Sequence, residues 1–429
     1  MRVLVVGAGG REHALAWKIS RSPLAEKVYC APGNPGTARV AENLPIAADD
    51  VERLARWARE NAIDLVVVGP EAPLVGGLCD RLAGSGVAAF GPSAAAARLE
   101  GSKAFAKEVM EAAGIPTASH RVFESLEPAA AYARAREGKV VVKADGLAAG
   151  KGVVVCGSVA EAEAALRSLL VERVHGAAGS RVVVEERLEG PEASVIALTD
   201  GKRLLTLPPA QDHKRIFDGD QGPNTGGMGA FCPTPTVDAA LLAEVERTVL
   251  LPTIAEMARR GTPFRGALYA GLMLTERGPR VLEFNARFGD PETQPILMRL
   301  GSDLLPALLG AARGELGGAR LEFDPRAAVG VVLAAEGYPG TVVQGDVVEG
   351  AEEALGEGVE VFQAATARGP DGKLRTAGGR VLTVCALGRD LEEAAARAYR
   401  AAGTIRFRGG QYRRDIGRAL SPARNREVT

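Results

Sequence analysis

The sequence predicts a multidomain protein of mixed α/β and α+β class, whose first domain is a parallel sheet covered by helices on both faces. The chain has 429 residues, too many for one compact core, which indicates roughly two to four domains. Short β-branched runs alternate with helical patterns through the first part of the chain, as expected for parallel strands joined by helices. Farther along, a glycine-rich segment joins one strand to another, which is typical of antiparallel pairing.

The first domain is expected at residues 1–102. Its strands are Val3–Val6, Lys27–Cys30, Asp64–Val68 and Ala88–Phe90, and its first helices begin near Arg11 and span about Val51–Asn61. Each strand ends in a loop that carries glycine or proline. Because ligands of parallel sheets bind where the carboxyl ends of the strands meet, we expect these loops to bind a substrate.

The second domain is expected at 103–326 and the third at 327–429. One helix over Ala94–Ala113, closed by Gly114, is predicted to lead into the second domain. A smaller lobe follows at about 117–190. The third domain is a small α/β unit with several strands, a hairpin turn at 369–373 and a helix near Leu391–Ala402.

Charge and hydropathy exclude several kinds of partner. The chain carries 52 basic and 53 acidic residues, so its formal net charge is −1 and no overall positive field attracts nucleic acid or a membrane surface. No run of roughly 18 apolar residues could cross a bilayer, and the five cysteines form no CxxC pair. We therefore expect a cytoplasmic protein that is a monomer. The basic segment 406–417 is interpreted as a solvated face or a local phosphate contact.

The stretch VVKADGLAAGKGVVV, residues 141–155, is similar to a phosphate-binding P-loop but differs from one at two positions. The spacing from Gly146 to Gly150 is one residue short, and Gly152 stands where a P-loop has Ser or Thr. A P-loop also runs from a strand into a helix, whereas both flanks here are strand-like. We interpret the stretch as a hairpin lid over a triphosphate, with Lys143 below the phosphates and Lys151 within the lid.

A glycine-rich hairpin that binds no ligand is the alternative for residues 141–155, and the two lysines weigh against it.

The next segment, RVVVEERLEGPEASV at 181–195, runs from a strand into an acidic turn. Backbone groups there could bind the edge of an adenine, and Glu192 could accept hydrogen bonds from ribose hydroxyls. A charged edge strand is the alternative for this segment.

Loops of the first domain supply candidates for substrate binding. In VVGAGGREHALA, Gly7 and Gly9 fit the dinucleotide-binding fingerprint, but Glu12 replaces its third glycine. We expect a phosphate at this helix N-terminus beside Arg11, with an ordinary strand-to-helix turn as the alternative. The loops GPEAP and APGNPGTA add Glu71 and Asn34, polar groups suited to sugar hydroxyls or an amine; a solvated loop is their alternative.

The segment QDHKRIFDGDQGPNTGGMGA, residues 211–230, is predicted to be a long polar loop without a helix or central strand. Such a loop inside a folded domain contacts a ligand or is disordered. Its mixture of acid and base suits a zwitterion such as an amino acid. The candidates are Asp212, His213, Lys214 and Asn224.

The stretch RVLEFNARFGDPETQP, residues 280–295, carries the clearest chemical pattern. On a strand, Glu283, Asn285 and Arg287 share one face while Phe284 and Ala286 point into the core. Carboxylate and amide oxygens are ligands for Mg²⁺ held together with substrate phosphates. An arginine beside them would stabilise a phosphoryl group in transfer. An exposed sheet surface is the alternative.

These motifs together resemble the ATP-grasp superfamily of carboxylate–amine ligases, and within it the glycinamide ribonucleotide synthetase family. The resemblance rests on GAGGREHALA, KADGLAAGKGVVV, QDHKR…GPNTGGMGA and EFNARFGDPETQ, and covers essentially the whole chain. It implies a pre-ATP-grasp domain, a two-lobed ATP-grasp domain with a glycine-hairpin lid, and a small C-terminal domain. It also implies ligation of glycine to 5-phosphoribosylamine with ATP and Mg²⁺ or Mn²⁺, and transient contact with other enzymes of purine synthesis.

Carried over residue by residue, the resemblance implies a role for each matching position. Asp212, together with Lys143 and Arg287, is expected to act in catalysis. ATP is expected to contact Lys103, Lys143, Gly146, Gly150, Lys151, Gly152, Glu185, Glu186, Leu188 and Glu192, and metal to contact Glu283 and Asn285. Substrates are expected at Gly9, Gly10, Arg11, Asn34, Glu71, Asp212, His213, Lys214, Asn224 and Arg287. One departure is that the preceding strand, LYAGLML, lacks the second carboxylate that many ATP-grasp enzymes carry.

Three other functions compete with this one. A nicotinamide dehydrogenase is suggested only by GAGG. A nucleotide sensor without catalysis would not need Glu283, Asn285 and Arg287 together. A sister ligase with another amine or carboxylate is the closest rival.

Overall fold

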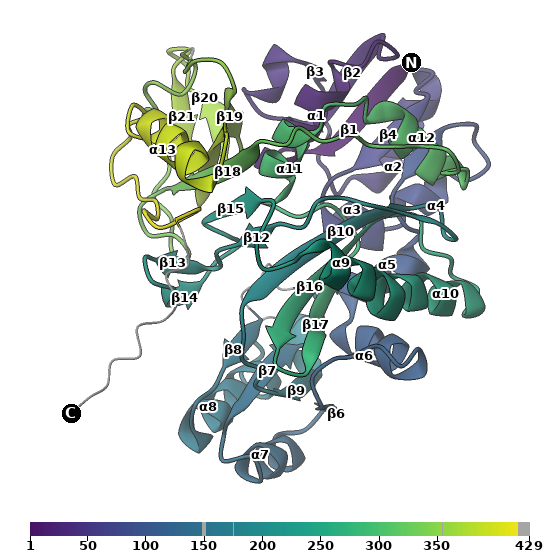
Figure 1. The fold of residues 1–429 in the computed structure, drawn as a ribbon, viewed down its shortest axis with the longest axis vertical. Coiled ribbons are helices and arrows are strands. Elements are labelled where there is room, and N and C mark those ends of the chain that lie inside the picture. Colours follow the sequence, from purple (N-terminus) through teal and green to yellow (C-terminus); the bar gives the residue numbers. More distant parts are fainter. Residues whose placement is uncertain (148–151, 175, 354, 419–429) are drawn as a thin grey trace.

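The computed structural model describes residues 1–418 except 148–151, 175 and 354 (Figure 1). The first domain contains a parallel sheet, as predicted. Its strand order is β3-β2-β1-β4-β5. Its strands are β1 (Arg2–Gly7), β2 (Lys27–Pro32), β3 (Glu42–Asn43), β4 (Leu65–Val68) and β5 (Ala88–Phe90). Its helices are α1 (Gly10–Ile19), η1 (Thr37–Arg39), α2 (Val51–Glu60), α3 (Glu71–Val75) and α4 (Leu78–Leu82).

Both faces of this sheet are buried, which explains its unbroken apolar strands. Along β1, Leu4 and Val6 pack into one apolar cluster with α2, whereas Val3 and Val5 pack into another with α1. The helices α11 (Thr293–Arg299) and α12 (Leu305–Arg313), from much later in the chain, share that second face. The second face of this sheet therefore packs against helices from a later part of the chain.

The helix expected over Ala94–Ala113 is wrong as a single element, because the chain breaks it at Ser102. The two helices are α5 (Ala94–Gly101) and α6 (Lys103–Ala112). Ser102 is extended, with φ −140° and ψ 112°, and its hydroxyl caps α6 at the amide of Phe105. The same hydroxyl donates to Asp145, which also accepts from the Ala104 amide. A tertiary contact thus decides the break.

The smaller lobe, at the bottom of Figure 1, is an antiparallel sheet of order β6-β9-β7-β8 covered by two helices. Its elements are β6 (His120–Phe123), α7 (Leu126–Arg134), β7 (Val140–Ala144), β8 (Val153–Val155), α8 (Val159–Leu170), η2 (Gly176–Ser180) and β9 (Val182–Glu186). Lys143 pairs with Val153 across β7 and β8, so the predicted strand-to-strand connection is confirmed. Gly150 and Lys151 lie outside the described residues.

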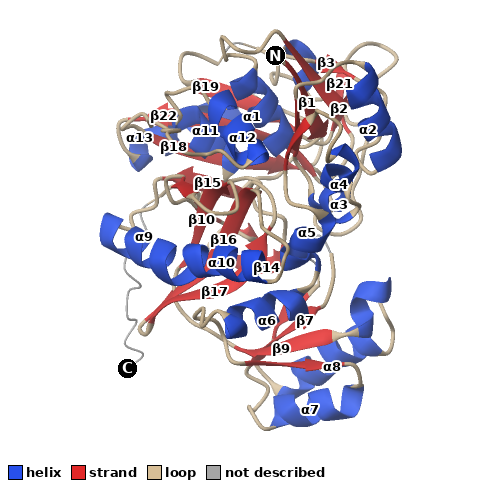
Figure 2. Ribbon diagram, turned by 90° about the vertical axis from the view of Figure 1, so that its right-hand side faces the viewer, coloured by secondary structure: helices blue, strands red, loops and turns tan. Residues whose placement is uncertain are grey.

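A central antiparallel sheet of order β11-β10-β16-β17 joins this lobe to the first domain (Figure 2). Its strands are β10 (Glu192–Thr199), β11 (Leu204–Thr206), β16 (Gly266–Thr275) and β17 (Gly278–Asn285). The helical segment α9 (Ala239–Val245), η3 (Glu246–Leu250) and α10 (Leu251–Arg259) packs on one apolar face. On the opposite face, Ile196, Leu198 and Ala267 pack into the apolar cluster shared with the first domain. Further along the strands this face is polar at Ser194 and Glu283, and it carries the site described below.

The last sheet has the order β12-β15-β18-β22-β19 and takes two strands from the middle of the chain. Its strands are β12 (Gln211–Asp212), β15 (Gly229–Cys232), β18 (Ala327–Ala334), β19 (Val359–Gln363) and β22 (Arg380–Gly388), covered by α13 (Leu391–Ala402). The pair β20 (Thr366–Arg368) and β21 (Leu374–Thr376) confirms the hairpin turn predicted at 369–373. The predicted boundary between 326 and 327 therefore separates strands that pair.

The segment 211–230 also contains strands, so its prediction as a structureless loop is wrong. Besides β12 and the start of β15, it forms the hairpin of β13 (Arg215–Phe217) and β14 (Gln221–Asn224). Its strand β15 pairs with β18, a partner roughly a hundred residues away in sequence.

Within the described residues, no helix is long and apolar enough to cross a membrane.

A buried histidine joins the first domain to the last sheet and makes stability depend on pH. His13 in α1 accepts a hydrogen bond at Nδ1 from the Gln363 amide, at 2.8 Å. Burial lowers the pKa of His13 from 6.5 to about 4. The unfolded chain therefore takes up this proton first, so the contribution of His13 is complete above pH 6.5 and is lost as the pH falls to about 4.

We expect acidification over that range to cost about 3 kcal/mol of unfolding free energy through His13 alone. Urea unfolding at several pH values measures this cost. His13→Asn keeps an acceptor near the position of Nδ1 but does not titrate, so it should reduce the acid slope. An unchanged slope in that variant would rule out His13 as the source.

Candidate active site

The floor of the candidate site is the polar face of the central sheet. The register places Ser194 of β10 opposite Gly271 of β16, which in turn lies opposite Glu283 of β17. Tyr269 lies opposite Asn285 one step along the strands. Because Gly271 has no side chain, the row Ser194–Gly271–Glu283 leaves room between its two outer side chains. A Cβ added to Gly271 would lie 3.3 Å from Glu283 Cγ.

Glu283 and Asn285 occupy the end of β17, with alternation as predicted. Phe284 and Ala286 are buried at 3% and 1% exposure. Among the described residues, the side chains of Glu283 and Asn285 form no hydrogen bond or ion pair, so their oxygens are uncommitted. Burial would raise the pKa of Glu283, but the charges of Lys214, Lys143 and Lys103 outweigh it and lower that pKa. Glu283 is therefore an ionised oxygen donor.

Arg287 follows β17 and lies between two carboxylates. Its Nη2 lies 2.9 Å from Glu100 Oε1, and its Nε lies 3.5 Å from Glu71 Oε2. Burial alone would lower the pKa of Arg287, but Glu100 and Glu71 raise it well above its ordinary value. Sequence reasoning selected Glu71 but missed Glu100. No local sequence pattern marks the carboxylate of Glu100.

A group of lysines faces Glu283 from the neighbouring elements. Lys103 Nζ donates to the Gly146 carbonyl at 3.1 Å, at the base of the predicted lid. Lys143 Nζ donates to the Leu282 carbonyl at 2.8 Å and pairs with Glu185 Oε2 at 3.0 Å. The predicted ATP contacts Lys103 and Lys143 thus lie together near Glu283, whose pKa both of them lower.

Glu185, predicted at the adenine hinge, is buried and bound by two lysines. Lys107 reaches the same Oε2 at 3.2 Å and also donates to the Thr117 hydroxyl. Burial lowers the pKa of Lys107 to about 8. Sequence reasoning missed Lys107, although it lies one helical turn after Lys103 in GSKAFAK. The Oε1 atom of Glu185 is buried without a hydrogen-bond partner among the described residues.

The remaining predicted ATP contacts line the connection from β9 to β10 and the base of the lid. Glu186 ends β9 and lies 3.8 Å from Arg277, and Leu188 is half-buried in the connection. Glu192 begins β10 and pairs with Lys214 at 2.7 Å. Gly146 and Gly152 flank the part of the lid that is not described. A Cβ on Gly146 would lie 2.6 Å from the Cβ of Ala178, so the hairpin base requires glycine.

A second polar group adjoins the metal-ligand candidates. Glu292 Oε1 accepts from the Ser194 and Tyr269 hydroxyls, both at 2.9 Å. Burial raises the pKa of Asp212 to about 7, and the nearby carboxylate of Glu292 adds to this rise while Lys214 opposes it. We call this group the carboxylate bay; its charged members are Asp212, Lys214, Glu192, Glu283 and Glu292. Because the carboxylates outnumber the single lysine, the carboxylate bay favours an added cation. Sequence reasoning selected Asp212 and Lys214 but missed Ser194, Tyr269 and Glu292.

His213 follows Asp212 directly, and its buried Nδ1 atom has no hydrogen-bond partner among the described residues. Its role toward a ligand and that of Asn224 stay predictions. The His213 ring packs against Phe231 with centroids 5.8 Å apart, and burial lowers its pKa to about 4. Asn224 ends β14. Arg413, from the basic segment 406–417, is 1% exposed and pairs with Asp220 at 2.6 Å. Arg413 therefore anchors the hairpin, and the expectation of a solvated face is wrong at this position.

The glycine turn of the first domain is already filled by its own side chains. The Gly9 amide donates to Glu12 Oε2 at 2.7 Å, and Arg11 is buried against Glu12 and the Phe288 carbonyl. Gly10 begins α1 and packs near Gln294. A phosphate at this turn would have to compete with the Glu12 carboxylate for the Gly9 amide.

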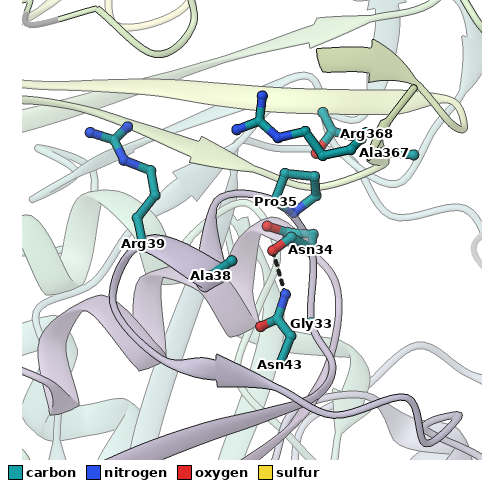
Figure 3. Close-up of a pocket in the computed structure, with 9 residues that line it drawn as sticks. Gly33, Asn34, Pro35, Ala38, Arg39, Asn43, Ala367 and Arg368 are labelled. Carbon is teal, nitrogen blue, oxygen red and sulfur yellow. Dashed lines mark hydrogen bonds between the residues drawn. The ribbon is translucent and has the colours of Figure 1, made fainter. Parts of the chain in front are cut away.

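Asn34 is committed to holding loops together. Its amide nitrogen donates to the carbonyls of Ala8 and Gln363, and its side-chain oxygen accepts from the Gly36 amide. The side-chain amide of Asn43 donates to the backbone carbonyl of Asn34, as Figure 3 shows. An open pocket of about 510 Å³ lies beside it, lined in part by Arg39 and Arg368. The contacts of Asn34 are structural, and they leave its role toward a substrate a prediction.

Comparison with known proteins gives matches along the chain. Models of phosphoribosylglycinamide synthetase match at residues 1–100 (N domain), 101–293 (ATP-grasp domain) and 328–419 (C domain). The chain is 51% identical over 422 residues to a phosphoribosylamine–glycine ligase of Rhodopirellula baltica, covering 96% of both chains. It is 52% identical over 429 residues to that of Allochromatium vinosum, covering 99% of this chain and 100% of the relative.

Solved structures agree with this assignment. The phosphoribosylamine–glycine ligase of Thermotoga maritima superposes with a TM-score of 0.85 at 36% identity, covering 97% of this chain and all of that one. A biotin carboxylase domain of Hydrogenobacter thermophilus, solved with MgADP, shares the fold with a TM-score of 0.72 at 20% identity, covering 96% and 91%. The predicted fold class is confirmed, and the chain belongs to the phosphoribosylglycinamide synthetase family.

Proposed function

We propose that this chain ligates glycine to 5-phosphoribosylamine at the expense of ATP, giving glycinamide ribonucleotide, ADP and phosphate in de novo purine synthesis. The observation that carries the proposal is the end of β17. There, uncommitted Glu283 and Asn285 oxygens face Lys103 and Lys143 on one side and the carboxylate bay of Asp212 on the other. Relatives of this chain that match it at about half identity carry the corresponding name.

The donor set fits a divalent metal. Glu283 is ionised, Asn285 offers an amide oxygen, and neither is bound to another described side chain. Hard oxygen donors of this kind suit Mg²⁺, and we propose Mg²⁺ with Mn²⁺ as a substitute. When bound, the metal would neutralise charge on the transferring phosphoryl group. Within the described part of the chain, no group of three acidic, histidine or cysteine ligands forms a metal site without substrate.

The residues of this chain are proposed to act by orientation and charge. A glycine carboxylate oxygen attacks the γ-phosphorus of ATP, the bond to ADP breaks, and glycyl phosphate forms. Lys103, Lys143 and Arg287 offset the negative charge of that step. The glycine ammonium would lie in the carboxylate bay of Asp212 and Glu292.

In the second step the amine of phosphoribosylamine attacks the acyl carbon, loses a proton, and phosphate leaves. Glu71, on the first domain, lies near Arg287 and is our candidate to orient that amine or its sugar. The β7–β8 hairpin is proposed to exclude water, since an acyl phosphate hydrolyses readily when water reaches it. We further propose that the chain works in the cytoplasm as a monomer, with transient contacts to neighbouring pathway enzymes.

The decisive assay measures ADP release from ATP and Mg²⁺ with freshly prepared phosphoribosylamine, in the presence and absence of glycine. We expect ADP release to require both glycine and the amine, and the product to contain one glycyl amide per ADP. Alanine and β-alanine in place of glycine test the sister-ligase alternative. ADP release that ignores glycine, or that is supported equally by another amino acid, would refute the proposal.

A further inference from the structure

Glu100 holds Arg287 from a different part of the chain. It lies in the last turn of α5, and its side chain is 8% exposed. One oxygen, Oε1, lies 2.9 Å from Arg287 Nη2, and the other, Oε2, accepts from the Ala286 amide at 2.7 Å. The same carboxylate therefore fixes both the side chain of Arg287 and the backbone just before it.

The other edge of Arg287 is not held in the same way. Glu71 lies 3.5 Å from Nε, and this buried Nε forms no hydrogen bond among the described residues. The Nη1 atom donates to the Phe288 carbonyl at 3.2 Å. Arg287 thus has an oriented guanidinium with one buried donor left over, which is unusual because buried donors are normally paired.

We propose that Glu100 is the positioning residue of Arg287 in the ligation reaction. By holding Nη2 and the Ala286 amide, it orients the guanidinium so that Nε remains free to donate to the group being transferred. A donor aligned before the reaction need not reorganise during it, and this lowers the barrier rather than strengthening ground-state binding. The inference rests on the proposed function, because it assigns Arg287 to the group in transfer.

A double-mutant cycle of Glu100→Gln and Arg287→Ala tests the proposal. Gln has the shape of Glu, but it brings donor hydrogens against Arg287 or Ala286 and removes the charge. We expect Glu100→Gln to lower kcat by roughly 10- to 100-fold with little change in KM for ATP. In the Arg287→Ala background the same change should have an effect within about twofold, since Glu100 acts through Arg287. Equal losses in both backgrounds, or no loss in the wild type, would overturn it.

A structural readout accompanies the kinetics. Hydrogen exchange at the Ala286 amide should speed up in Glu100→Gln, while the unfolding midpoint stays near that of the wild type. If Glu100→Gln does not fold, Glu100→Asp replaces it in the cycle, with a smaller expected loss of kcat and the same dependence on Arg287. Glu108→Gln, at an exposed carboxylate of α6, is the matched control and should change neither quantity.

The cycle also separates this inference from the proposed function. It compares four variants with whichever acceptor supports ADP release. A wild-type enzyme that ignores glycine refutes the proposed substrate but still reports whether Glu100 and Arg287 are coupled. A glycine-dependent enzyme without coupling refutes only the role of Glu100.

Discussion

Glu283→Gln is expected to lower the rate of glycine-dependent ADP release by roughly a thousand-fold while the protein stays folded. The change removes an ionised oxygen donor at the end of β17 but keeps the shape of the side chain. Since Glu283 forms no hydrogen bond or ion pair among the described residues, little native structure depends on its charge. Initial rates over a range of Mg²⁺ concentrations, with thermal unfolding alongside, measure both effects.

The matched control is Glu276→Gln, in the exposed turn between β16 and β17. This variant loses a carboxylate from the same hairpin and should keep full activity. If Glu283→Gln also retained near-normal rates at low Mg²⁺, the assignment of Glu283 as a metal ligand would be wrong. Recovery of activity at high Mg²⁺ would instead support that assignment, because a weakened site fills at higher metal concentration.

Lys143→Met is expected to have the second largest effect, about a hundred-fold on kcat/KM for ATP. Lys143 is buried at 6% exposure between Glu185 and the Leu282 carbonyl, and it lowers the pKa of Glu283. Its removal takes away a charge that we assign to the ATP phosphates. We also expect about 2 kcal/mol of lost stability, since Glu185 keeps only Lys107 as a partner. Steady-state kinetics and urea unfolding give the two numbers.

Lys107→Met distinguishes these two effects. Lys107 binds the same oxygen of Glu185 at 3.2 Å, but it is not among the principal charges that act on Glu283. The variant should therefore lose similar stability while keeping most of its activity. Equal losses of activity in the two variants would show that Glu185 must be doubly paired, and would remove the evidence for a phosphate contact at Lys143.

The first domain could be predicted from sequence because its signal is local. Strands such as Val3–Val6 are apolar on both faces, and each is followed by a glycine or proline loop. The face of Glu283 and Asn285 could be predicted for the same reason, since strand alternation needs only neighbouring residues. The family motifs then supplied the lysines and the hinge, which local patterns alone left open.

What sequence reasoning missed depends on contacts between distant segments. The break at Ser102 is fixed by Asp145, forty-three residues away. β15 forms a strand because β18 pairs with it, although its own glycine-rich sequence favours a loop. Glu100 reaches Ala286 over 186 residues, and a single glutamate at a helix end carries no mark of that role.

The sharing of strands between the middle and the end of the chain limits how the protein can be divided. β15 covers one edge of β18, and Phe231 on β15 belongs to the same apolar cluster as Val329 and Val331. A fragment that starts at residue 327 would expose that edge and lose part of its core. The complementary fragment would carry β15 paired only with the two-residue strand β12. The two pieces are therefore expected to be insoluble when produced separately, and to recover a native fold only when they are brought together.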